Sequence, residues 1–90
     1  MHRMNIEFDT AKDAVNRAKH GFPLALGALI LASAEITQQD DRRDYGEVRL
    51  NAFGVVNGRL LVCTYTMRDQ VYRIISVRKA SRQEQRQCLS

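Results

Sequence analysis

The sequence lacks the motifs of several common classes of small protein. It contains no GxxxxGKS or GxxxxGKT phosphate loop, no GxGxxG dinucleotide turn, no HExxH pair and no CxxC pair. Its two cysteines, Cys63 and Cys88, have a spacing typical of neither a metal site nor a disulfide framework. Nucleotide, dinucleotide and zinc chemistry therefore have no support in the sequence, and we expect no metal site and no cofactor.

Long apolar runs are also missing. The longest, FPLALGALILASA at residues 22–34, is shorter than the roughly 20 apolar residues that cross a bilayer, and it is rich in glycine and alanine. The first residues, MHRMNIEFDT, lack the apolar core of a signal peptide. We therefore expect no membrane association and a cytoplasmic protein, in keeping with its unpaired cysteines.

Acidic residues are scarce in the second half of the chain. Residues 46–90 hold 8 Lys/Arg against 3 Asp/Glu, whereas residues 1–45 hold 6 against 7. With 90 residues, 44% of them hydrophobic and 27% charged, the chain is predicted to be one soluble domain spanning 1–90. Its basic half predicts a field for a polyanion, although such a surface is often merely solvated.

Residues 9–34 predict two helices. Asp9 or Thr10 can cap the first helix and Gly21 can end it in the left-handed conformation. One apolar stripe on this helix places the polar side chains on or beside its other face; the stripe comprises Ala11, Ala14, Val15 and Ala18, and the polar group comprises Lys12, Asn16, Lys19 and His20. Pro23 can open a second helix that runs to about Ala34, with Gly27 a weak point.

The remaining segments predict a sheet. A short strand is expected at residues 5–8 and an exposed loop at 37–46, followed by strands at 47–56, 59–67 and 71–78. Asn57-Gly58 is a strong hairpin signal, and Ser81 with Glu84 forms the capping box of a short terminal helix. The fold class is α+β, with N-terminal helices packed on an antiparallel three- to four-stranded sheet and a short C-terminal helix.

Arginines occur on strands that otherwise resemble core. Strict alternation puts Arg73 on one face of strand 71–78 and Arg78 on the other, while Glu47 and Arg49 share a face of strand 47–56 with Asn51. These charged residues can gather on the sheet face that the helices leave uncovered. Two interpretations stay open: a surface ion-pair ladder, or a site whose guanidinium groups hold RNA phosphates and stabilise a pentacovalent transition state.

His20 is the candidate for proton transfer, because its ordinary pKa near 6.5 suits a general base or acid at neutral pH. A histidine just before a helix-ending glycine is also commonly a simple helix-end cation. Glu47 and Lys19 are rival proton-transfer groups.

The segments 8–21 and 44–86 resemble the BrnT toxin family of type II toxin–antitoxin systems. The elements that match, in order, are Phe8-Asp9, Lys12, Asn16, Lys19-His20-Gly21, Gly46-Glu47, Arg49, Gly58-Arg59, Tyr65-Thr66, Arg73-Ile74-Ile75-Ser76, Arg78 and Ala80. Each piece alone is weak, but the combined KHG, GE-x-R and RIIS-x-R pattern is fairly specific.

This resemblance implies a RelE-like fold and a metal-independent ribonuclease that halts translation and growth. It implies that His20, Glu47, Arg49, Arg73 and Arg78 line the RNA site. Supporting RNA contacts are expected from Lys12, Lys19, Arg59 and Lys79. The implied partner is a BrnA-type antitoxin, two toxins joining two antitoxins, with operator DNA bound only through the antitoxin.

The second helix departs from the family pattern, because Ala25 and Leu26 stand where acidic residues are usual. We expect its apolar surface to contact antitoxin or a second copy of the chain. One rival interpretation is a catalytically inactive RNA- or partner-binding module. Another, a regulator that binds DNA by itself, is disfavoured because neither N-terminal helix reads as a basic recognition helix.

Overall fold

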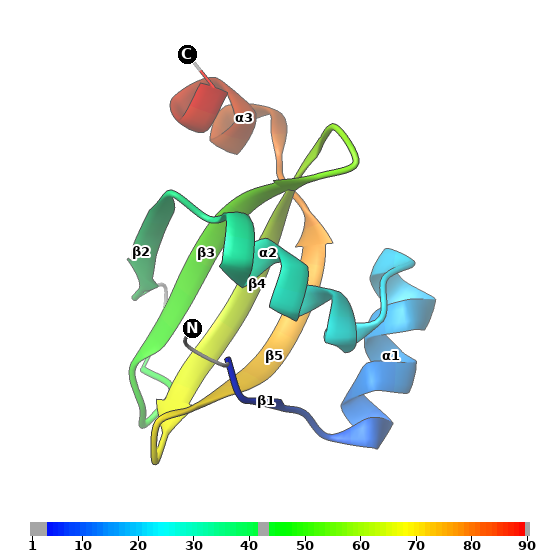
Figure 1. Cartoon of the computed structure of the whole chain (residues 1–90), viewed down its shortest axis with the longest axis vertical. Helices are drawn as coiled ribbons and strands as arrows, with labels where there is room; N and C mark the ends of the chain where they lie inside the picture. Colours follow the sequence, from blue (N-terminus) through cyan, green and yellow to red (C-terminus); the bar gives the residue numbers. More distant parts are fainter. Residues whose placement is uncertain (1–3, 42–43, 90) are drawn as a thin grey trace.

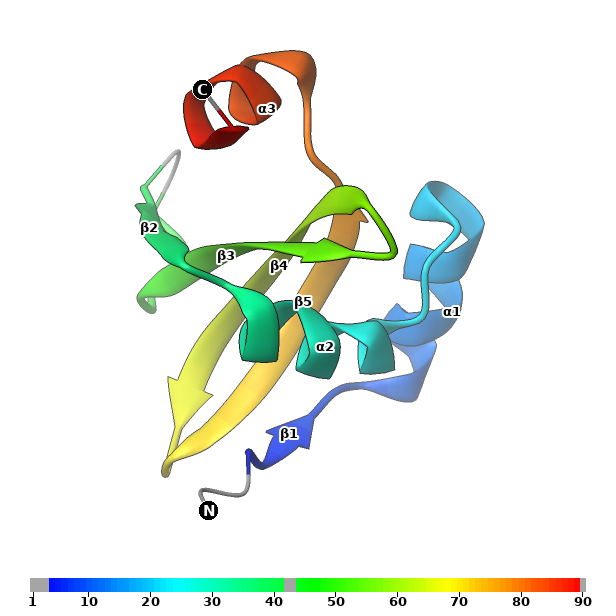
Figure 2. The same ribbon diagram turned by 45° about the horizontal axis from the view of Figure 1, so that its top comes forward.

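The computed structural model describes residues 4–41 and 44–89, and this part of the chain forms a five-stranded mixed sheet with three α-helices (Figures 1 and 2). The strand order across the sheet is β1-β5-β4-β3-β2. The elements are β1 (Ile6–Glu7), α1 (Thr10–His20), the 3₁₀ turn η1 (Leu24–Leu26), α2 (Gly27–Ser33), β2 (Ile36–Asp40), β3 (Arg49–Val56), β4 (Arg59–Arg68), β5 (Val71–Lys79) and α3 (Arg82–Leu89). Among the described residues, no helix is long and apolar enough to cross a membrane.

The predicted three-strand meander is confirmed. Strands β3, β4 and β5 pair antiparallel in sequence order. Asn57 and Gly58 have φ values of 51° and 76°, which fit the predicted two-residue turn. Asp69 and Gln70 adopt similar positive φ values at the second hairpin, so both turns have the backbone twist that matches twisted strands.

The expected antiparallel sheet of three to four strands was wrong in strand number and in one orientation, because two flanking strands extend the meander. The two-residue β1 pairs parallel with β5, and β2 pairs antiparallel with β3 where an exposed loop was predicted. That loop prediction was wrong for residues 37–40 because an edge strand is held by backbone hydrogen bonds, and its solvated side chains need no apolar period. Arg42 and Arg43 of the predicted loop lie outside the described residues.

Helix α1 has the predicted ends but not the expected orientation. Asp9 Oδ1 accepts hydrogen bonds from the N–H groups of Ala11 (2.8 Å) and Lys12 (3.2 Å), and Gly21 ends the helix at φ 81°. The apolar stripe nevertheless faces solvent, since Val15 is 64% exposed, and the one buried residue of the helix is Asn16. Helix α1 therefore does not dock through an apolar face.

Helix α1 lies beside the edge of β5, beyond the end of β1 (Figure 1), and polar side chains attach it there. Asn16 Nδ2 donates to the carbonyls of Val77 (2.9 Å) and Phe22 (2.8 Å), and Asn16 Oδ1 accepts from the Val77 N–H (3.2 Å). Asp13 Oδ1 accepts from the Leu24 N–H at 2.7 Å. A sheet edge presents unpaired backbone groups, so polar side chains fit it better than an apolar stripe.

The apolar segment 22–34 covers one face of the sheet. It forms η1 and α2 in place of the single helix predicted from Pro23 to Ala34, and Leu24 and Ile30 are fully buried. They pack in the main core with Ala52, Leu61, Cys63, Tyr65, Ile74 and Val77. Leu26 and Leu31 also pack against this core, so much of the apolar surface expected to meet a partner is buried within the chain, whereas Leu29 remains 56% exposed.

A smaller apolar cluster lies on the opposite face, where α3 meets the sheet. Phe53, Leu60, Val62 and Ala80 form it, with Cys88 of α3 packed against them. The predicted capping box is confirmed, because the Glu84 N–H donates to Ser81 Oγ (3.1 Å) and the Ser81 N–H donates to Glu84 Oε1 (2.9 Å).

Candidate functional site

An irregularity in β5 brings Arg73 and Arg78 to the same face of the sheet. Arg73 lies opposite Thr66 and Arg78 opposite Val62, two positions of the same parity on β4. The register shifts between them, which leaves Ile75 as the extra residue. Strict alternation had placed the two arginines on opposite faces, and that prediction was wrong because one extra residue reverses every side chain beyond it.

Both arginines lie on what we call the open face, the side of the sheet opposite η1 and α2. Three rows of its side chains cross several strands, as the pairing registers show. The charged row contains Asp40, Arg49, Thr66, Arg73 and Glu7. The neutral row contains Gln38, Asn51, Thr64 and Ser76. The third row contains the apolar residues Ile36, Phe53 and Val62 together with Arg78, and it lies under α3.

The charged row holds two arginines two strands apart, about 10 Å between their backbones at the usual strand spacing. Arg49 Nε lies 3.4 Å from Glu47 Oε1, and Arg73 Nη1 lies 3.7 Å from Glu7 Oε1. The two arginine side chains are 23% and 26% exposed. Such long, partly solvated ion pairs are weak, so both guanidinium groups keep N–H donors for an incoming anion.

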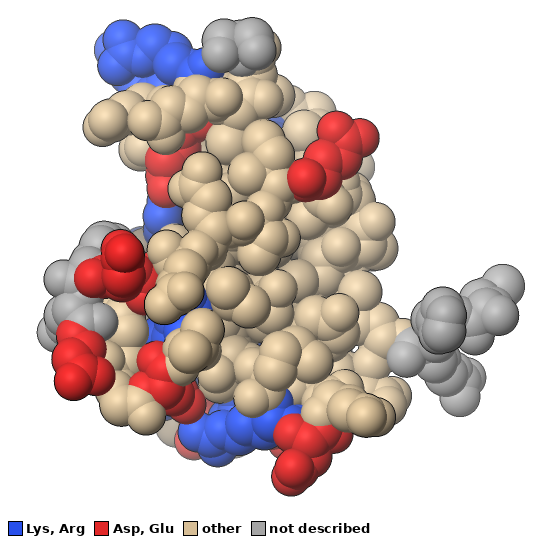
Figure 3. All heavy atoms as spheres, turned by 90° about the vertical axis from the view of Figure 1, so that its left-hand side faces the viewer, with Lys and Arg blue, Asp and Glu red and all other residues tan. Residues whose placement is uncertain are grey.

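Tyr45 orients Arg49, because the Arg49 guanidinium carbon lies 4.0 Å from the centre of the Tyr45 ring. Tyr45 Oη in turn donates to Asp40 Oδ2 at 3.3 Å. Acidic and basic side chains are intermixed along one side of the molecule, beside a surface with few charges (Figure 3). We therefore expect the open face to attract an anion only locally, where its arginines lie.

Arg78 is engaged far more tightly than the other two arginines. Its Nη1 and Nη2 donate to Glu84 Oε1 and Oε2 at 2.7 and 2.9 Å. These hydrogen bonds are the main reason why the pKa of Glu84 is lowered to about 2. Glu47 takes part in two weaker ion pairs, with Arg49 and with Arg68 (3.4 Å each).

His20 lies at the Arg78 end of the sheet. Partial burial lowers its pKa, and the positive charges of Lys19 and Arg78 lower it further. The side chain is therefore neutral at pH 7, the form that accepts a proton. The positions of Arg78 and Arg73 are separated by four residues of β4, about 13 Å, so the structure divides the predicted site into a His20–Arg78 group and a Glu47–Arg49–Arg73 group.

The supporting basic residues divide in the same way. Hydrogen bonds from the backbone N–H groups of Lys12 and Ala11 lower the pKa of Asp9 most, and the charges of Arg73 and Lys12 lower it further. Lys12 and Arg73 both lie near Asp9, so Lys12 belongs with the Arg73 group. The register places Arg59 and Lys79 on the helix-covered side, in line with Leu61. They do not join the rows of the open face.

The chain matches a family model over residues 8–84, that of the ribonuclease toxin BrnT of type II toxin–antitoxin systems. It belongs to the BrnT family. Membership indicates a ribonuclease toxin as the activity and an antitoxin as the partner, and the matched range runs from before α1 into the first turn of α3. A search of the curated proteins finds no match.

Sequence reasoning missed the hydroxyl and amide groups between the arginines of this BrnT chain. Thr64 Oγ1 donates to Asn51 Oδ1 at 2.6 Å, and Thr66 Oγ1 donates to the Val48 carbonyl at 2.7 Å. Together with Ser76, they give the open face a neutral polar floor. The alternation of Val62, Thr64 and Thr66 along β4 is a signal that could have revealed this floor.

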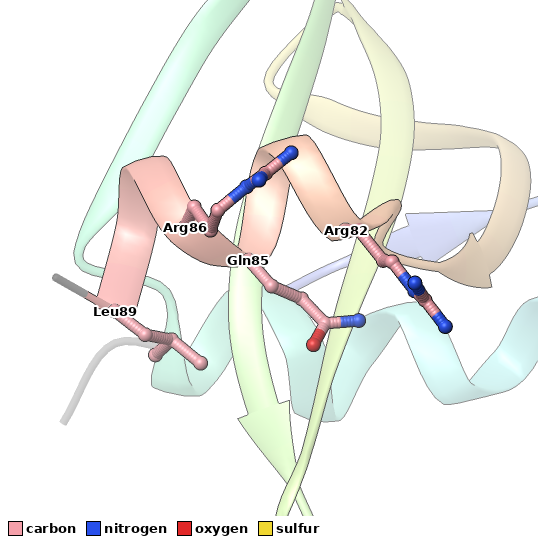
Figure 4. Close-up of a pocket in the computed structure, with 4 residues that line it drawn as sticks. All are labelled: Arg82, Gln85, Arg86 and Leu89. Atoms are coloured by element: carbon pink, nitrogen blue, oxygen red, sulfur yellow. The ribbon is translucent and has the colours of Figure 1, made fainter.

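A cavity of about 440 Å³ lies beside α3 and is lined by Arg82, Gln85, Arg86 and Leu89 (Figure 4). None of the predicted site residues lines it. In the described part of the chain, no group of three or more His, Cys, Asp or Glu side chains is placed to hold a metal ion.

Proposed function

We propose that this BrnT-family protein is an endoribonuclease that cleaves RNA on its open face without a metal ion and thereby inhibits translation and growth. One observation carries the proposal: the register of β5 gathers Arg73 and Arg78 with Arg49 on a single face of the sheet. We further propose a RelE-like fold in one domain. The proposed inhibitor is a BrnA-type antitoxin in a complex of two toxins and two antitoxins, which contacts operator DNA only through the antitoxin.

The proposed reaction uses a nucleophile within the substrate. A general base removes the proton of a ribose 2′-OH, and the resulting oxygen attacks the adjacent phosphorus. The bond from phosphorus to the 5′-oxygen breaks, and that oxygen takes a proton, which gives a 2′,3′-cyclic phosphate and a 5′-OH. The arginines stabilise the extra negative charge on the pentacovalent phosphorus. A metal ion is not required because the nucleophile is already next to its target.

Cleavage of naked RNA in the presence of EDTA tests this reaction directly. We expect the purified chain to produce fragments that end in cyclic phosphate, and the Arg73→Ala, His20→Ala double variant to leave the RNA intact. Cleavage that depends on Mg²⁺ and leaves 3′-OH ends would contradict the proposal. If both proteins leave the RNA intact, growth arrest on expression distinguishes a ribosome-dependent toxin from an inactive one.

The pH dependence of cleavage identifies the base. With His20 as base, the rate should rise with pH to a plateau, and the midpoint should lie below 6.5 because the pKa of His20 is lowered. Lys19→Ala removes a nearby positive charge and should move this midpoint to higher pH. Single-turnover rates between about pH 5 and pH 8 measure the effect. A rise that survives in His20→Ala and vanishes in Glu47→Gln would assign the base to Glu47 instead.

A second candidate function is binding without cleavage, as an inactive RNA- or partner-binding module. The observation that favours it is that Arg49, Arg73 and Arg78 each have an acidic partner in the free chain. These carboxylates neutralise part of the positive charge that cleavage would need. Under this alternative, RNA binds to the open face and emerges uncut, and expression does not arrest growth.

A further inference from the structure

The guanidinium group of Arg78 already holds an anion in the geometry that suits a phosphate. Two of its nitrogens donate to the two carboxylate oxygens of Glu84 at 2.7 and 2.9 Å. A phosphodiester presents two non-bridging oxygens to a guanidinium in the same side-by-side manner. The Glu84 carboxylate therefore stands where a phosphate group would bind, and the two cannot occupy that position together.

The helix that carries Glu84 is lightly attached to the sheet. None of the residues of α3, all of which are described, is fully buried. Besides the Arg78–Glu84 pair, α3 is held by Cys88, which packs against the smaller apolar cluster, and by Gln85 Nε2, which donates to the Ala80 carbonyl at 3.1 Å. Little buried apolar area opposes the movement of α3 once Glu84 is released.

Arg49 and Arg73 are paired more loosely than Arg78. Their carboxylate partners lie at 3.4 Å (Glu47 to Arg49) and 3.7 Å (Glu7 to Arg73), and each makes a single contact to that arginine. Of Arg49, Arg73 and Arg78, it is thus Arg78 whose anion position is filled within the chain.

We propose that Arg78 is a phosphodiester-binding position that Glu84 fills in the free protein, and that RNA displaces Glu84 and releases α3 from the open face. This inference rests on the proposed RNA-binding function of the open face. It adds that Glu84 is an internal competitor, and that RNA longer than the Arg49–Arg73 span must displace it to reach Arg78.

Glu84→Gln isolates the competition, because glutamine keeps the capping box with Ser81 while it removes the charge that holds Arg78. Glu35→Gln is the matched control: it removes the same charge from an exposed residue that precedes β2, outside the rows of the open face. The probe is a fully 2′-O-methylated RNA oligonucleotide, which lacks the attacking hydroxyl and stays intact. We expect Glu84→Gln to bind it about five- to tenfold more tightly than Glu35→Gln does, at equal ionic strength.

The two cysteines report the movement of α3. Cys63 is fully buried and its pKa is raised to about 12 by burial, so it should not react with a thiol reagent while the chain is folded. Cys88 is half-buried where α3 meets the sheet. We expect the oligonucleotide to speed the labelling of Cys88 several-fold in the wild type, and Glu84→Gln to label faster even without RNA.

The outcomes separate the inference from the function on which it rests. Suppose that Arg73→Ala weakens RNA binding, but Glu84→Gln and Glu35→Gln bind RNA equally well and the labelling rate of Cys88 does not change. This result would overturn the displacement of Glu84 and would still support RNA binding on the open face. If neither the wild type nor either variant binds the oligonucleotide, both the proposed RNA binding on the open face and this inference are wrong.

Discussion

Replacing Arg73 by alanine should slow RNA cleavage by about 100- to 1,000-fold, the usual loss when one group that stabilises transition-state charge is removed. The folded state should hardly change, because the Arg73–Glu7 contact is long and the Glu7 side chain is 45% exposed. Such pairs contribute from about 0 to 1 kcal/mol to stability. Cleavage rates measured beside urea unfolding curves would separate the two effects.

Arg17→Ala is the matched control for Arg73→Ala. It removes the same charge from an exposed side chain on α1, away from the open face: Arg17 is 62% exposed and lies 3.1 Å from Asp13. We expect cleavage by this variant to stay within about twofold of the wild type, since only distant electrostatics changes. If Arg73→Ala instead costs roughly 3–5 kcal/mol of stability, Arg73 belongs to a structural ion pair and the assignment to RNA is wrong.

Replacing Asn16 by alanine should destabilise the fold strongly. It leaves the buried N–H and carbonyl of Val77 and the partly buried carbonyl of Phe22 without their partner. Each lost group costs about 1–3 kcal/mol, and the better helix propensity of alanine returns about 0.5 kcal/mol. We expect a net loss of about 3 kcal/mol, which lowers Tm by about 12–24 °C in a domain of this size and is measured by thermal unfolding.

Val15→Ala on the same helix is the control for Asn16→Ala. The sequence pattern places Val15 in the apolar stripe, but its side chain is 64% exposed. We expect the free energy of unfolding to change by less than about 0.5 kcal/mol, as for most exposed positions. A large loss in Val15→Ala together with a small one in Asn16→Ala would mean that α1 docks through its apolar stripe after all.

The local features of this fold were predictable because they depend on neighbouring residues. The caps Asp9 and Gly21, the turn at Asn57-Gly58 and the Ser81–Glu84 capping box all appear as expected. Each is set by the backbone preference or hydrogen-bonding reach of a side chain over a few positions. Binary patterning likewise predicted the three-strand meander.

The errors occurred where long-range contacts outweigh local pattern. The polar strand β2 has no apolar period, and it forms because β3 offers it an edge. The orientation of α1 was inverted because Asn16 meets unpaired backbone groups of Val77, a residue 61 positions later. Neither contact leaves a signal in the adjacent sequence.

The candidate site shows the same division. The sequence alone determined which residues carry its charge, since arginines on strands predict an anion site wherever they meet. Only the tertiary structure decided that Arg73 and Arg78 share a face, because the extra residue Ile75 is fixed by pairing with β4, and a shift of one residue exchanges the two faces of a strand. The same packing brought Glu84 onto Arg78 and left Arg49 and Arg73 loosely paired, because α3 docks over one end of the sheet and leaves the charged row uncovered.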